Sequence, residues 1–409
     1  MANVSSSNGL EKRPKLRFPG FDEPWNESKL SACFAKNIKK NTDGRISNVI
    51  CNSAKMGLIP QRDYFDKDIA NSDNTSGYYI IEHNDFVYNP RKSSDAPYGP
   101  ISRYAYPDAG IVSPLYLCFR AKGDVDTNFF EWYFRSSAWH RYIYMTGDSG
   151  ARHDRVSIKD DDFFSMPIRF PSSIEQKKIA SFLNAIERRI SSQQLLVDNL
   201  KKYKRGLQNR FFFKRSHLSP KASEIDSHDV EPLGSVVHIN PKTGSLPEAF
   251  IYIDLECVES GVLNSKKLIS RNSAPSRAQR LLEEGDLLYQ MVRPYQKNNY
   301  YFQKGFEYPT VASTGYAQIR CSEMDTQFIY EQLSSDYFAR EAMLRSTGTG
   351  YPAINADDLA EIPIWVPPLN QQEKIGAALS FLGEKIEVHQ KLLSALCSVK
   401  SSLLQQLFI

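Results

Sequence analysis

The chain has 409 residues, of which 41% are hydrophobic and 24% are charged, and its formal net charge is +4. This length allows two or three domains, each with its own core, and the composition is that of an ordinary globular protein. Aromatic residues make up 12% of the chain, which argues against intrinsic disorder. The small net charge excludes a wholly basic nucleic-acid-binding protein, so any contact with nucleic acid must come from local groups of residues.

The six cysteines are scattered, with no CxxC pair and no histidine cluster beside them. This spacing favours free thiols in a reducing compartment over disulfides or a zinc site. The opening residues MANVSSSNGL lack the apolar core of a signal peptide, and no run of 18 apolar residues occurs. We therefore expect a cytoplasmic protein with no membrane segment and no metal.

The first half begins with a polar tail, residues 1–24, followed by a domain predicted over residues 25–171. Short β-rich runs separated by Gly, Asn, Asp and Pro dominate this domain. The predicted strands are Tyr78–Ile81, Asp85–Tyr88 and Ile111–Phe119, with a further strand near Val156. An amphipathic helix is predicted over Thr127–Met145, ended by Gly147.

A long helix is predicted next, within residues 172–216, and Ser172 with Glu175 fits a capping box at its start. Apolar residues recur at steps of four and three, a spacing of 3.5 that is typical of helices wound around a partner helix. The segment contains eleven Lys and Arg against three acidic residues, a net charge of +8, which makes it a candidate DNA-facing surface. The predicted seam consists of Ile179, Leu183, Ile186, Ile190, Val197, Leu200 and Leu207.

After a linker over residues 214–232, a second domain (217–367) and a second long helix (368–409) are predicted. The predicted elements of this domain are strands over Ile251–Leu255, Asp286–Gln290 and Ala317–Arg320 and a helix over Thr326–Leu344. Asn370 and Glu373 are expected to cap the second long helix. Its seam consists of Ile375, Leu379, Leu382, Ile386, Leu393, Leu396 and Leu403.

The second half repeats the first. The two seams align at a constant offset of 196, and matching pieces of the domains follow in order at offsets between 196 and 201. An offset that changes only between elements indicates an internal duplication. The polar residues Gln193 and Lys204, which interrupt the first seam, recur as His389 and Lys400. Gln193 opposite His389, or Lys204 opposite Lys400, would fix the register of an intramolecular helix pair or face a partner subunit. A helical hairpin that serves stability alone is the plainer alternative.

The motifs on this duplicated frame resemble, from end to end, the DNA-specificity subunits of type I restriction–modification systems. The resemblance rests on Lys15–Phe21 with Trp25, on Ile168–Pro171 before Glu175–Ala180, and on Ile364–Pro368 before Gln371–Ile375. It also rests on Pro275–Ala278, Gly285–Leu288 and Val292–Tyr295. Gln371 departs from the family, in which Glu is usual at this position.

The resemblance implies a mixed α+β fold in which two α/β target-recognition domains are separated by two long helices that form an antiparallel coiled coil. Each domain would read one half of a bipartite site in double-stranded DNA, and because the halves differ in sequence, the site would be asymmetric. The helices would set the spacer between half-sites and dock two methyltransferase subunits, with restriction/translocase subunits joining the full complex. The subunit itself would perform no chemistry and bind no cofactor.

Three regions suit DNA contacts, because basic and polar side chains on glycine-containing loops reach base edges and phosphates. Ordinary surface loops are the alternative for each residue. In the first region the candidates are Ser149, Arg152, His153 and Arg155; in the second, Thr349 and Tyr351; in the third, Arg271, Ser276, Arg277, Arg280, Arg293, Tyr295 and Lys297. The cluster Lys201, Lys202, Lys204 and Arg205 is either a solvated helix face or a contact to phosphate or to partner acids.

Signals of catalysis are missing from the sequence. It has no methyltransferase motif, no glycine-rich cofactor loop and no Walker A sequence. The run Asp160 to Asp162 resembles a metal site, but a turn or cap before the following strand is the favoured interpretation. We therefore predict a non-catalytic DNA-specificity subunit. The alternatives are a coiled-coil scaffold that never touches DNA and the recognition module of another restriction enzyme class.

Overall fold

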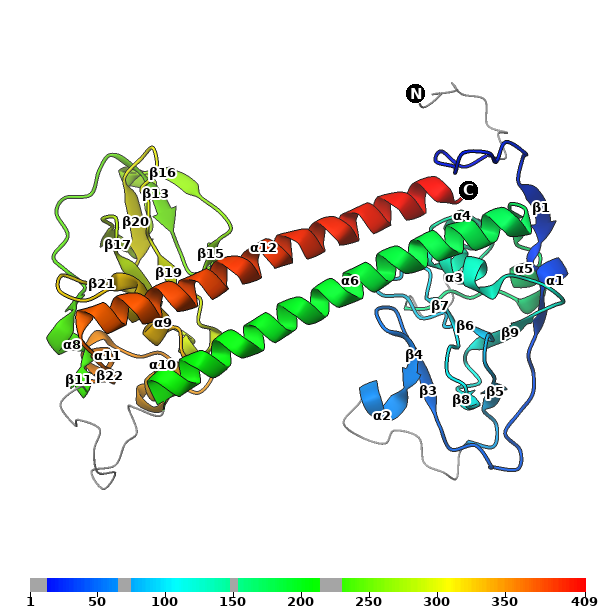
Figure 1. The fold of residues 1–409 in the computed structure, drawn as a ribbon, viewed down its shortest axis with the longest axis horizontal. Helices are drawn as coiled ribbons and strands as arrows, with labels where there is room; N and C mark the ends of the chain where they lie inside the picture. Colours follow the sequence, from blue (N-terminus) through cyan, green and yellow to red (C-terminus); the bar gives the residue numbers. More distant parts are fainter. Residues whose placement is uncertain (1–12, 65–74, 148–153, 214–229) are drawn as a thin grey trace. The chain divides into compact units, whose positions relative to one another are not determined.

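The computed structural model describes residues 13–64, 75–147, 154–213 and 230–409 (Figure 1). The chain divides into two compact units. Unit 1 consists of Met1–Ser192 and Leu393–Ile409, and unit 2 of Gln193–Leu392. Each unit therefore combines one predicted recognition domain with one part of each long helix.

Unit 1 is built around a four-stranded antiparallel sheet in the order β2-β9-β6-β7, accompanied by three two-stranded sheets. The strands of the larger sheet are β2 (Phe34–Lys36), β6 (Phe86–Tyr88), β7 (Ile101–Arg103) and β9 (Leu117–Ala121). The antiparallel pairs are β1 (Asn26–Lys29) with β10 (Pro167–Phe170), β3 (Ile50–Ser53) with β4 (Gly57–Pro60), and β5 (Tyr79–Ile81) with β8 (Gly110–Val112). The short helices are α1 (Leu30–Cys33), α2 (Gln61–Tyr64), α3 (Thr127–Arg135), α4 (His140–Thr146) and α5 (Asp160–Phe164).

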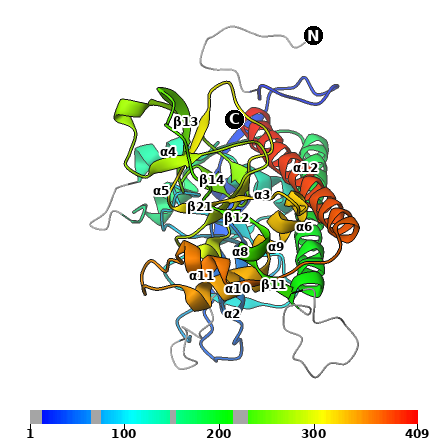
Figure 2. The same ribbon diagram turned by 90° about the vertical axis from the view of Figure 1, so that its left-hand side faces the viewer.

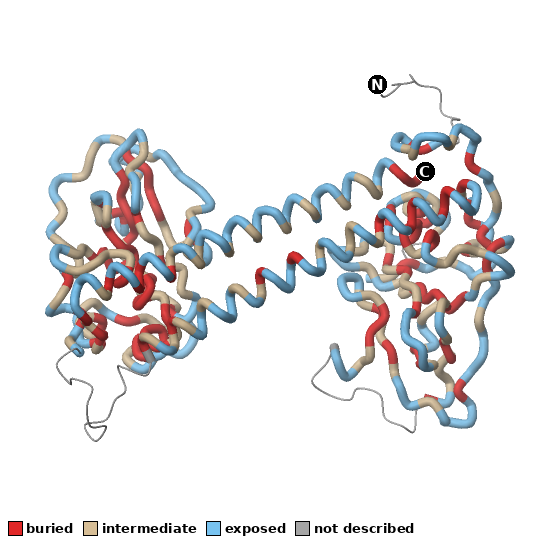
Figure 3. The backbone as a smooth tube through the Cα atoms, viewed as in Figure 1, coloured by how far each residue is buried: buried red, intermediate tan, exposed pale blue. Residues whose placement is uncertain are grey.

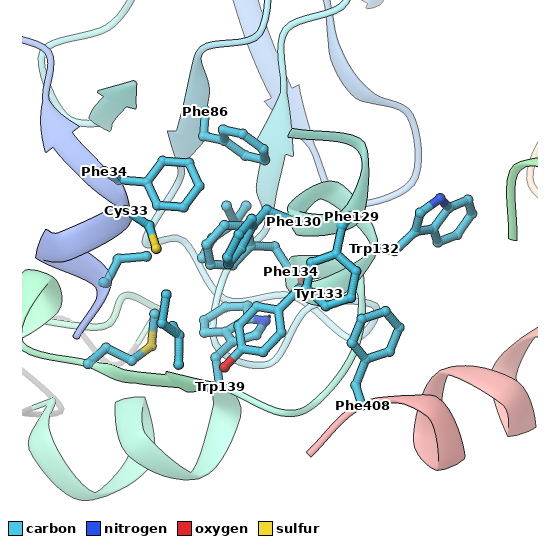
Figure 4. Packing of buried hydrophobic residues seen from close by; sticks show 14 of the residues in the cluster. Cys33, Phe34, Phe86, Phe129, Phe130, Trp132, Tyr133, Phe134, Trp139 and Phe408 are labelled. Atoms are coloured by element: carbon cyan, nitrogen blue, oxygen red, sulfur yellow. Dashed lines mark hydrogen bonds between the residues drawn. The ribbon is translucent and has the colours of Figure 1, made fainter. Parts of the chain in front are cut away.

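The core of unit 1 is an aromatic cluster beneath this sheet (Figure 4). Helix α3 begins where the Asp126 carboxylate accepts hydrogen bonds from two backbone N–H groups of its first turn. The helix then buries five of its nine side chains, among them Phe130 and Phe134, which pack against Phe34 of β2. The C-terminal end of the chain joins the same core through Phe408, whose ring lies 5.5 Å from that of Phe129.

Unit 2 contains two four-stranded sheets, in the orders β12-β21-β18-β19 and β16-β13-β20-β17. The strands of the first sheet are β12 (His238–Ile239), β18 (Leu287–Gln290), β19 (Tyr300–Tyr301) and β21 (Tyr316–Arg320). Those of the second are β13 (Ala249–Ile253), β16 (Lys267–Ser270), β17 (Ala278–Leu281) and β20 (Thr310–Ser313). The two remaining pairs are β11 (Val230–Pro232) with β22 (Pro363–Trp365) and β14 (Val258–Glu259) with β15 (Val262–Leu263). The helical elements are α8 (Leu233–Val236), α9 (Thr326–Leu333), α10 (Asp336–Arg345), α11 (Ala356–Ala360) and the 3₁₀ turns η3 (Arg271–Ser273) and η4 (Pro294–Gln296).

The strand pairings of the two units correspond, as the internal repeat predicts. The sheet β2-β9-β6-β7 has its counterpart in β12-β21-β18-β19, and the pair β1–β10 in β11–β22. The correspondence weakens in the second sheet of unit 2. There β13 and β20 form a parallel ladder, whereas unit 1 keeps a single parallel bridge between Val49 and Ile111. The framework has therefore been retained, and the sheet attached to it has diverged.

The two long helices are α6 (Ser173–Gln208), which ends in a π-helical turn η2 (Asn209–Phe213), and α12 (Leu369–Leu407). They run antiparallel and lie side by side in both ribbon views (Figures 1 and 2). All fourteen predicted seam residues are buried or half-buried, whereas most other helix positions are exposed (Figure 3). The 3.5-residue spacing therefore predicted the packed face correctly.

Some element predictions were wrong. The helices expected over Thr127–Met145 and Thr326–Leu344 are each two helices, α3 with α4 and α9 with α10. Both break at a buried serine, because the hydroxyls of Ser136 and Ser335 donate to the backbone carbonyls three residues earlier at 2.6 Å and close the first helix. The strand expected over Ile111–Phe119 is likewise divided into β8 and β9 by a turn.

The predicted caps of the long helices also differ. The Glu175 carboxylate, which was expected in a capping box, accepts two hydrogen bonds of 2.8 Å from the Arg17 guanidinium. Helix α12 begins at Leu369, so Asn370 lies inside its first turn. Asp160 to Asp162 form the first turn of the short helix α5, directly before β10. Within the described residues, no helix is long and apolar enough to span a membrane, and no group of three His, Cys, Asp or Glu side chains is placed to hold a metal ion.

Candidate nucleic-acid interface

Two of the predicted DNA-reading segments meet in unit 2. The loop 291–299 follows strand β18, and the loop 346–354 follows helix α10. The backbone N–H of Arg293 donates to the carbonyl oxygen of Pro352 at 2.7 Å, which joins the loops. The Arg293 guanidinium lies 4.3 Å from the centre of the Tyr351 ring, in the geometry of a cation–π contact. We call these two segments the unit 2 loop pair.

The first of these loops has a defined and strained backbone. Arg293 and Lys297 adopt the left-handed conformation, with φ values of 57° and 54°, on either side of the turn η4. Left-handed geometry costs a non-glycine residue about 1–2 kcal/mol. The buried side chain of Gln290 offsets this cost, because its amide nitrogen donates to Gln296 Oε1 at 2.8 Å and its amide oxygen accepts from the Asn298 N–H at 3.1 Å. The loop is therefore held in a single shape before any ligand arrives.

The loop pair leaves two aromatic side chains exposed. Tyr295 is 52% exposed and Tyr351 is 70% exposed. Thr349 beside them is also exposed, and Gly348 has a φ of 91° that suits glycine. Exposed aromatic and guanidinium planes are the groups on which proteins stack nucleobases or contact base edges.

The ammonium group of Lys297 is bound within the chain. It forms an ion pair with Asp336, the first residue of α10. The same carboxylate accepts a hydrogen bond of 2.5 Å from Arg205 of α6. Burial acts to raise the pKa of Asp336, but the hydrogen bonds from Lys297 and Arg205 outweigh it and hold that pKa below its usual value.

The other predicted residues of unit 2 belong to the sheet β16-β13-β20-β17. Arg271, Ser276 and Arg277 are exposed around the turn η3 and the start of β17. Arg280 lies within β17 and is half-buried, and its Nε has no hydrogen-bond partner. Burial lowers the pKa of Arg280. The structure thus divides the third predicted region into two groups that are built on different sheets.

In unit 1, Ser149, Arg152 and His153 lie outside the described residues. Arg155 is described and forms an antiparallel bridge with Arg91, in the loop after β6. The corresponding bridge in unit 2 joins Val292 to Ala353. Both units therefore bring together the loop after β6 or β18 and the loop after α4 or α10.

Sequence reasoning missed the basic residues Arg91 and Lys92 of unit 1. They flank the same junction, where the Lys92 N–H donates to the Asp154 carbonyl at 2.8 Å. The signal was present, because Arg91 aligns with Val292 at the offset of 201 that relates β6 to β18. If the alignment of the two halves is extended into the loops, Arg91 corresponds to Val292, which precedes Arg293, a residue predicted to contact DNA.

A repeated ion pair supports the strands that carry these loops. In unit 1 the buried Asp85 accepts from Arg120 Nε at 2.6 Å and from the Glu82 N–H at 2.8 Å. In unit 2 the buried Asp286 accepts from Arg320 Nε at 2.8 Å and from the Glu283 N–H at 2.7 Å. Each carboxylate closes the turn before β6 or β18 and so fixes the strand that leads into the loop at the junction. The hydrogen bond with Asp286 raises the pKa of Arg320.

One of the two predicted polar contacts in the helix pair is present. Gln193 Nε2 lies 2.9 Å from His389 Nδ1 and donates to the His389 carbonyl at 3.0 Å. Gln193 is buried, so its amide would be left unsatisfied in another register. This contact confirms that Gln193 faces His389, its counterpart in the repeat.

The predicted alternative, Lys204 opposite Lys400, is wrong. Lys204 pairs with Glu331 of α9 at 2.8 Å, and Lys400 pairs with Glu187 of α6 at 2.9 Å. Each lysine therefore has its own acid. Lys204 and Arg205 both bind acids of unit 2, so neither is part of a purely solvated helix face, whereas Lys201 and Lys202 are exposed.

Comparison with known proteins gives a consistent result. The family model described as "Type I restriction modification DNA specificity domain" matches residues 256–397. The type I restriction enzyme MjaVIII specificity subunit of Methanocaldococcus jannaschii is 25% identical over 56% of this chain and 58% of its own length. The putative MjaX specificity subunit of the same organism is 23% identical over 70% of this chain and 65% of its own. The matched segments thus span less than two thirds of either relative.

The fold has also been seen before. The crystal structure of a type I restriction–modification S subunit from M. genitalium superimposes with a TM-score of 0.59, covering 97% of this chain and 99% of that chain. The sequence identity is 17%, so this likeness concerns the fold alone.

Proposed function

We propose that this chain, which matches the type I restriction modification DNA specificity domain over residues 256–397 and is similar to type I specificity subunits, performs no catalysis itself and directs a methyltransferase complex to an asymmetric, bipartite DNA site. Each unit reads one half-site. The observation that supports this proposal most strongly is the recurrence of one loop junction, after β6 and α4 in unit 1 and after β18 and α10 in unit 2, on two copies of one sheet.

The side chains at the two junctions differ, which supports an asymmetric target. Arg91 and Arg155 form the bridge in unit 1, where Val292 and Ala353 form it in unit 2. The unit 2 loop pair instead offers the Arg293–Tyr351 stack. Protein loops that differ in donors and shape select different base sequences, as paired DNA-binding modules do for their half-sites.

The two helices are proposed to set the spacer between the half-sites and to dock the methyltransferase subunits, with restriction/translocase subunits joining the full complex. A rigid connection converts two weak half-site contacts into one tight contact when the spacing fits. Large apolar side chains on the two helices are exposed to solvent, and a docked subunit would bury them. They include Leu195 (61% exposed), Phe381 (55%) and Val388 (62%).

The decisive experiment co-expresses the chain with type I methyltransferase subunits and maps methylated adenines across the host genome. We expect methylation at one asymmetric motif whose halves are separated by a fixed spacer. A complex that forms without any such motif would refute DNA reading and would fit a scaffold. A motif without a stable complex of this composition would refute the proposed docking.

Loop variants assign the half-sites. Replacing Arg293 and Tyr351 together by alanine is expected to relax the motif in one half and leave the other half intact. Lys304→Ala, an exposed change in the same unit, is the matched control and is expected to leave both halves unchanged. Relaxation of both halves by the loop variant would contradict the assignment of one half-site to each unit. Insertion of one heptad into α6, with a matching heptad in α12, is expected to lengthen the spacer or to abolish activity.

A further inference from the structure

The Asp336 carboxylate of unit 2 pairs with basic side chains from two distant parts of the chain. It pairs with Lys297 of the loop 291–299 and with Arg205 of helix α6. The Asp336 and Lys297 side chains are only 30% and 29% exposed, so this pair is partly shielded from water and salt. Arg205 is 71% exposed and contributes the weaker contact.

The position of Lys297 lets this ion pair fix one end of the loop 291–299. Lys297 is the second left-handed residue of its loop and directly follows the turn η4. The other end of the loop is fixed by the Arg293 N–H bond to Pro352. Between the two fixed ends lies Tyr295, whose side chain points to solvent. Releasing Lys297 would leave this end of the loop held by the Gln290 side chain alone, through Gln296 and Asn298, and would loosen the segment that presents Tyr295.

Asp336 is itself held rigidly. It begins helix α10, and the preceding Ser335 caps that helix by accepting from the Phe338 N–H at 3.2 Å. The positive end of the helix dipole stabilises the carboxylate at this position. Asp336 can therefore act as a fixed anchor for the loop, and Arg205 adds a contact from the long helix to the same anchor.

The position in unit 1 that corresponds to Asp336 has no carboxylate. Ser136 in unit 1 is the counterpart of Ser335, since each donates its hydroxyl to a carbonyl three residues earlier at 2.6 Å. The residue after Ser136 is Ser137, which cannot bind a lysine as a carboxylate does. An effect of Asp336 on DNA reading is therefore expected in one half-site and not in the other.

We propose that Asp336 is the positioning residue of the loop 291–299, and that Lys297 acts through it rather than by contacting a DNA phosphate. This inference rests on the proposed DNA-reading function. It narrows the direct DNA contacts of the loop 291–299 to Arg293 and Tyr295, and it assigns the Lys297 side chain to holding this loop in place.

The two roles predict opposite results for Asp336→Asn. If Lys297 contacted a phosphate, removing the acid would free its charge and remove a repulsion, so DNA binding would tighten. If Asp336 positions the loop, the same change loosens the loop and binding weakens. Salt dependence separates the roles again, since loss of one phosphate contact lowers the slope of log affinity against log salt by about 0.9, and loss of a positioning contact leaves it unchanged.

The test uses the purified complex with its methyltransferase subunits and a duplex carrying the mapped motif, with a scrambled duplex as reference. Affinity is measured across a salt series for wild type, Lys297→Met, Asp336→Asn and the double variant. We expect each single variant to bind about 5- to 20-fold more weakly with the wild-type salt slope, and the double variant to equal either single one, because both remove the same contact. Lys297→Arg, which keeps the cation, is expected to restore most of the affinity.

Two controls test whether weaker binding comes from the loss of any positive charge or from unfolding of unit 2. Lys304→Met removes an exposed lysine from the same unit and is expected to change affinity less than twofold. A thermal unfolding midpoint of Asp336→Asn close to that of wild type shows that the unit is folded, and methylation mapping should show relaxation of one half-site. Tighter or unchanged binding by Asp336→Asn, or a lower salt slope for Lys297→Met, would overturn the inference. Failure of the proposed function is seen separately, when the wild-type complex binds the motif no better than the scrambled duplex, and the inference then fails with it.

Discussion

The C-terminal end of the chain is predicted to stabilise unit 1, and Phe408→Ala measures this contribution. The Phe408 side chain is 5% exposed and lies against the rings of Phe129, Tyr133 and Trp25, with centroid distances of 5.5, 6.2 and 6.4 Å. Replacing a buried phenylalanine by alanine costs about 3–5 kcal/mol through lost burial and the cavity left behind. Because Phe408 lies just past the end of helix α12 at Leu407, its surroundings can relax, and we expect a loss of about 3 kcal/mol.

Hydrogen exchange read by mass spectrometry locates the effect, because a single unfolding free energy is poorly defined for a chain with two units. Peptides from α3 are expected to lose about 100-fold of their protection, while peptides from residues 230–392 keep theirs. Phe381→Ala is the matched control: it removes the same side chain from α12 at a position that is 55% exposed, and protection should change little. Unchanged protection in α3, or an equal loss in unit 2, would refute this account of the aromatic core.

Three further predictions follow from individual contacts. Lys204→Met should lower the free energy of unfolding of unit 2 by about 2–3 kcal/mol, because the Glu331 carboxylate, whose side chain is 2% exposed, then loses its cation. Lys400→Met should lower that of unit 1 by under about 1 kcal/mol, because its partner Glu187 is 36% exposed. Hydrogen exchange, read on peptides of α9 for Lys204→Met and of α6 near Glu187 for Lys400→Met, checks this order, and the reverse order would contradict it. Replacing both Gln193 and His389 by leucine should raise the melting temperature, because an apolar pair replaces a polar contact in the seam, and Gln193→Leu alone should raise it less. A double variant that melts below wild type would count against the seam geometry. A thiol reagent at neutral pH should label the exposed Cys397 rapidly and the buried Cys118 slowly, since burial raises the pKa of Cys118 to about 12. Equal rates in the folded protein, compared by peptide mapping, would disprove this difference.

The features that the sequence predicted well are those set by residue spacing and by the internal repeat. The seam follows from a spacing of 3.5 residues, and all fourteen seam residues pack as expected. The duplication follows from ordered offsets, and it is confirmed by the matching strand orders of the two main sheets. The Gln193–His389 contact combines both signals, because each residue is a polar interruption at the same place in its repeat.

Long-range and backbone-dependent features escaped prediction. The break at Ser136 was missed because a serine within an amphipathic pattern is compatible with a continuous helix, and only its burial beside the Tyr133 carbonyl ends that helix. The left-handed backbone of Lys297 has no signature in residue type. Its partner Asp336 lies 39 residues away, at the start of a helix that was itself predicted to be the middle of a longer one.

Lys204 and Lys400 occupy the same position in the two copies of the repeat, but their acidic partners differ. In unit 1, Lys400 binds Glu187, which lies on the opposite helix. The counterpart of Glu187 in the second copy is Gly383, and a Cβ there would lie 3.1 Å from Lys204 Nζ. The acid of unit 2 is instead Glu331, on helix α9 of the recognition domain. The lysine of unit 1 therefore joins helix to helix, whereas the lysine of unit 2 joins helix to domain. Unit 1 also links its domain to α6 here, because Glu187 lies 3.8 Å from Arg135 of α3. In unit 2 the link is made by two basic residues of α6, Lys204 and Arg205, which pair with Glu331 and Asp336.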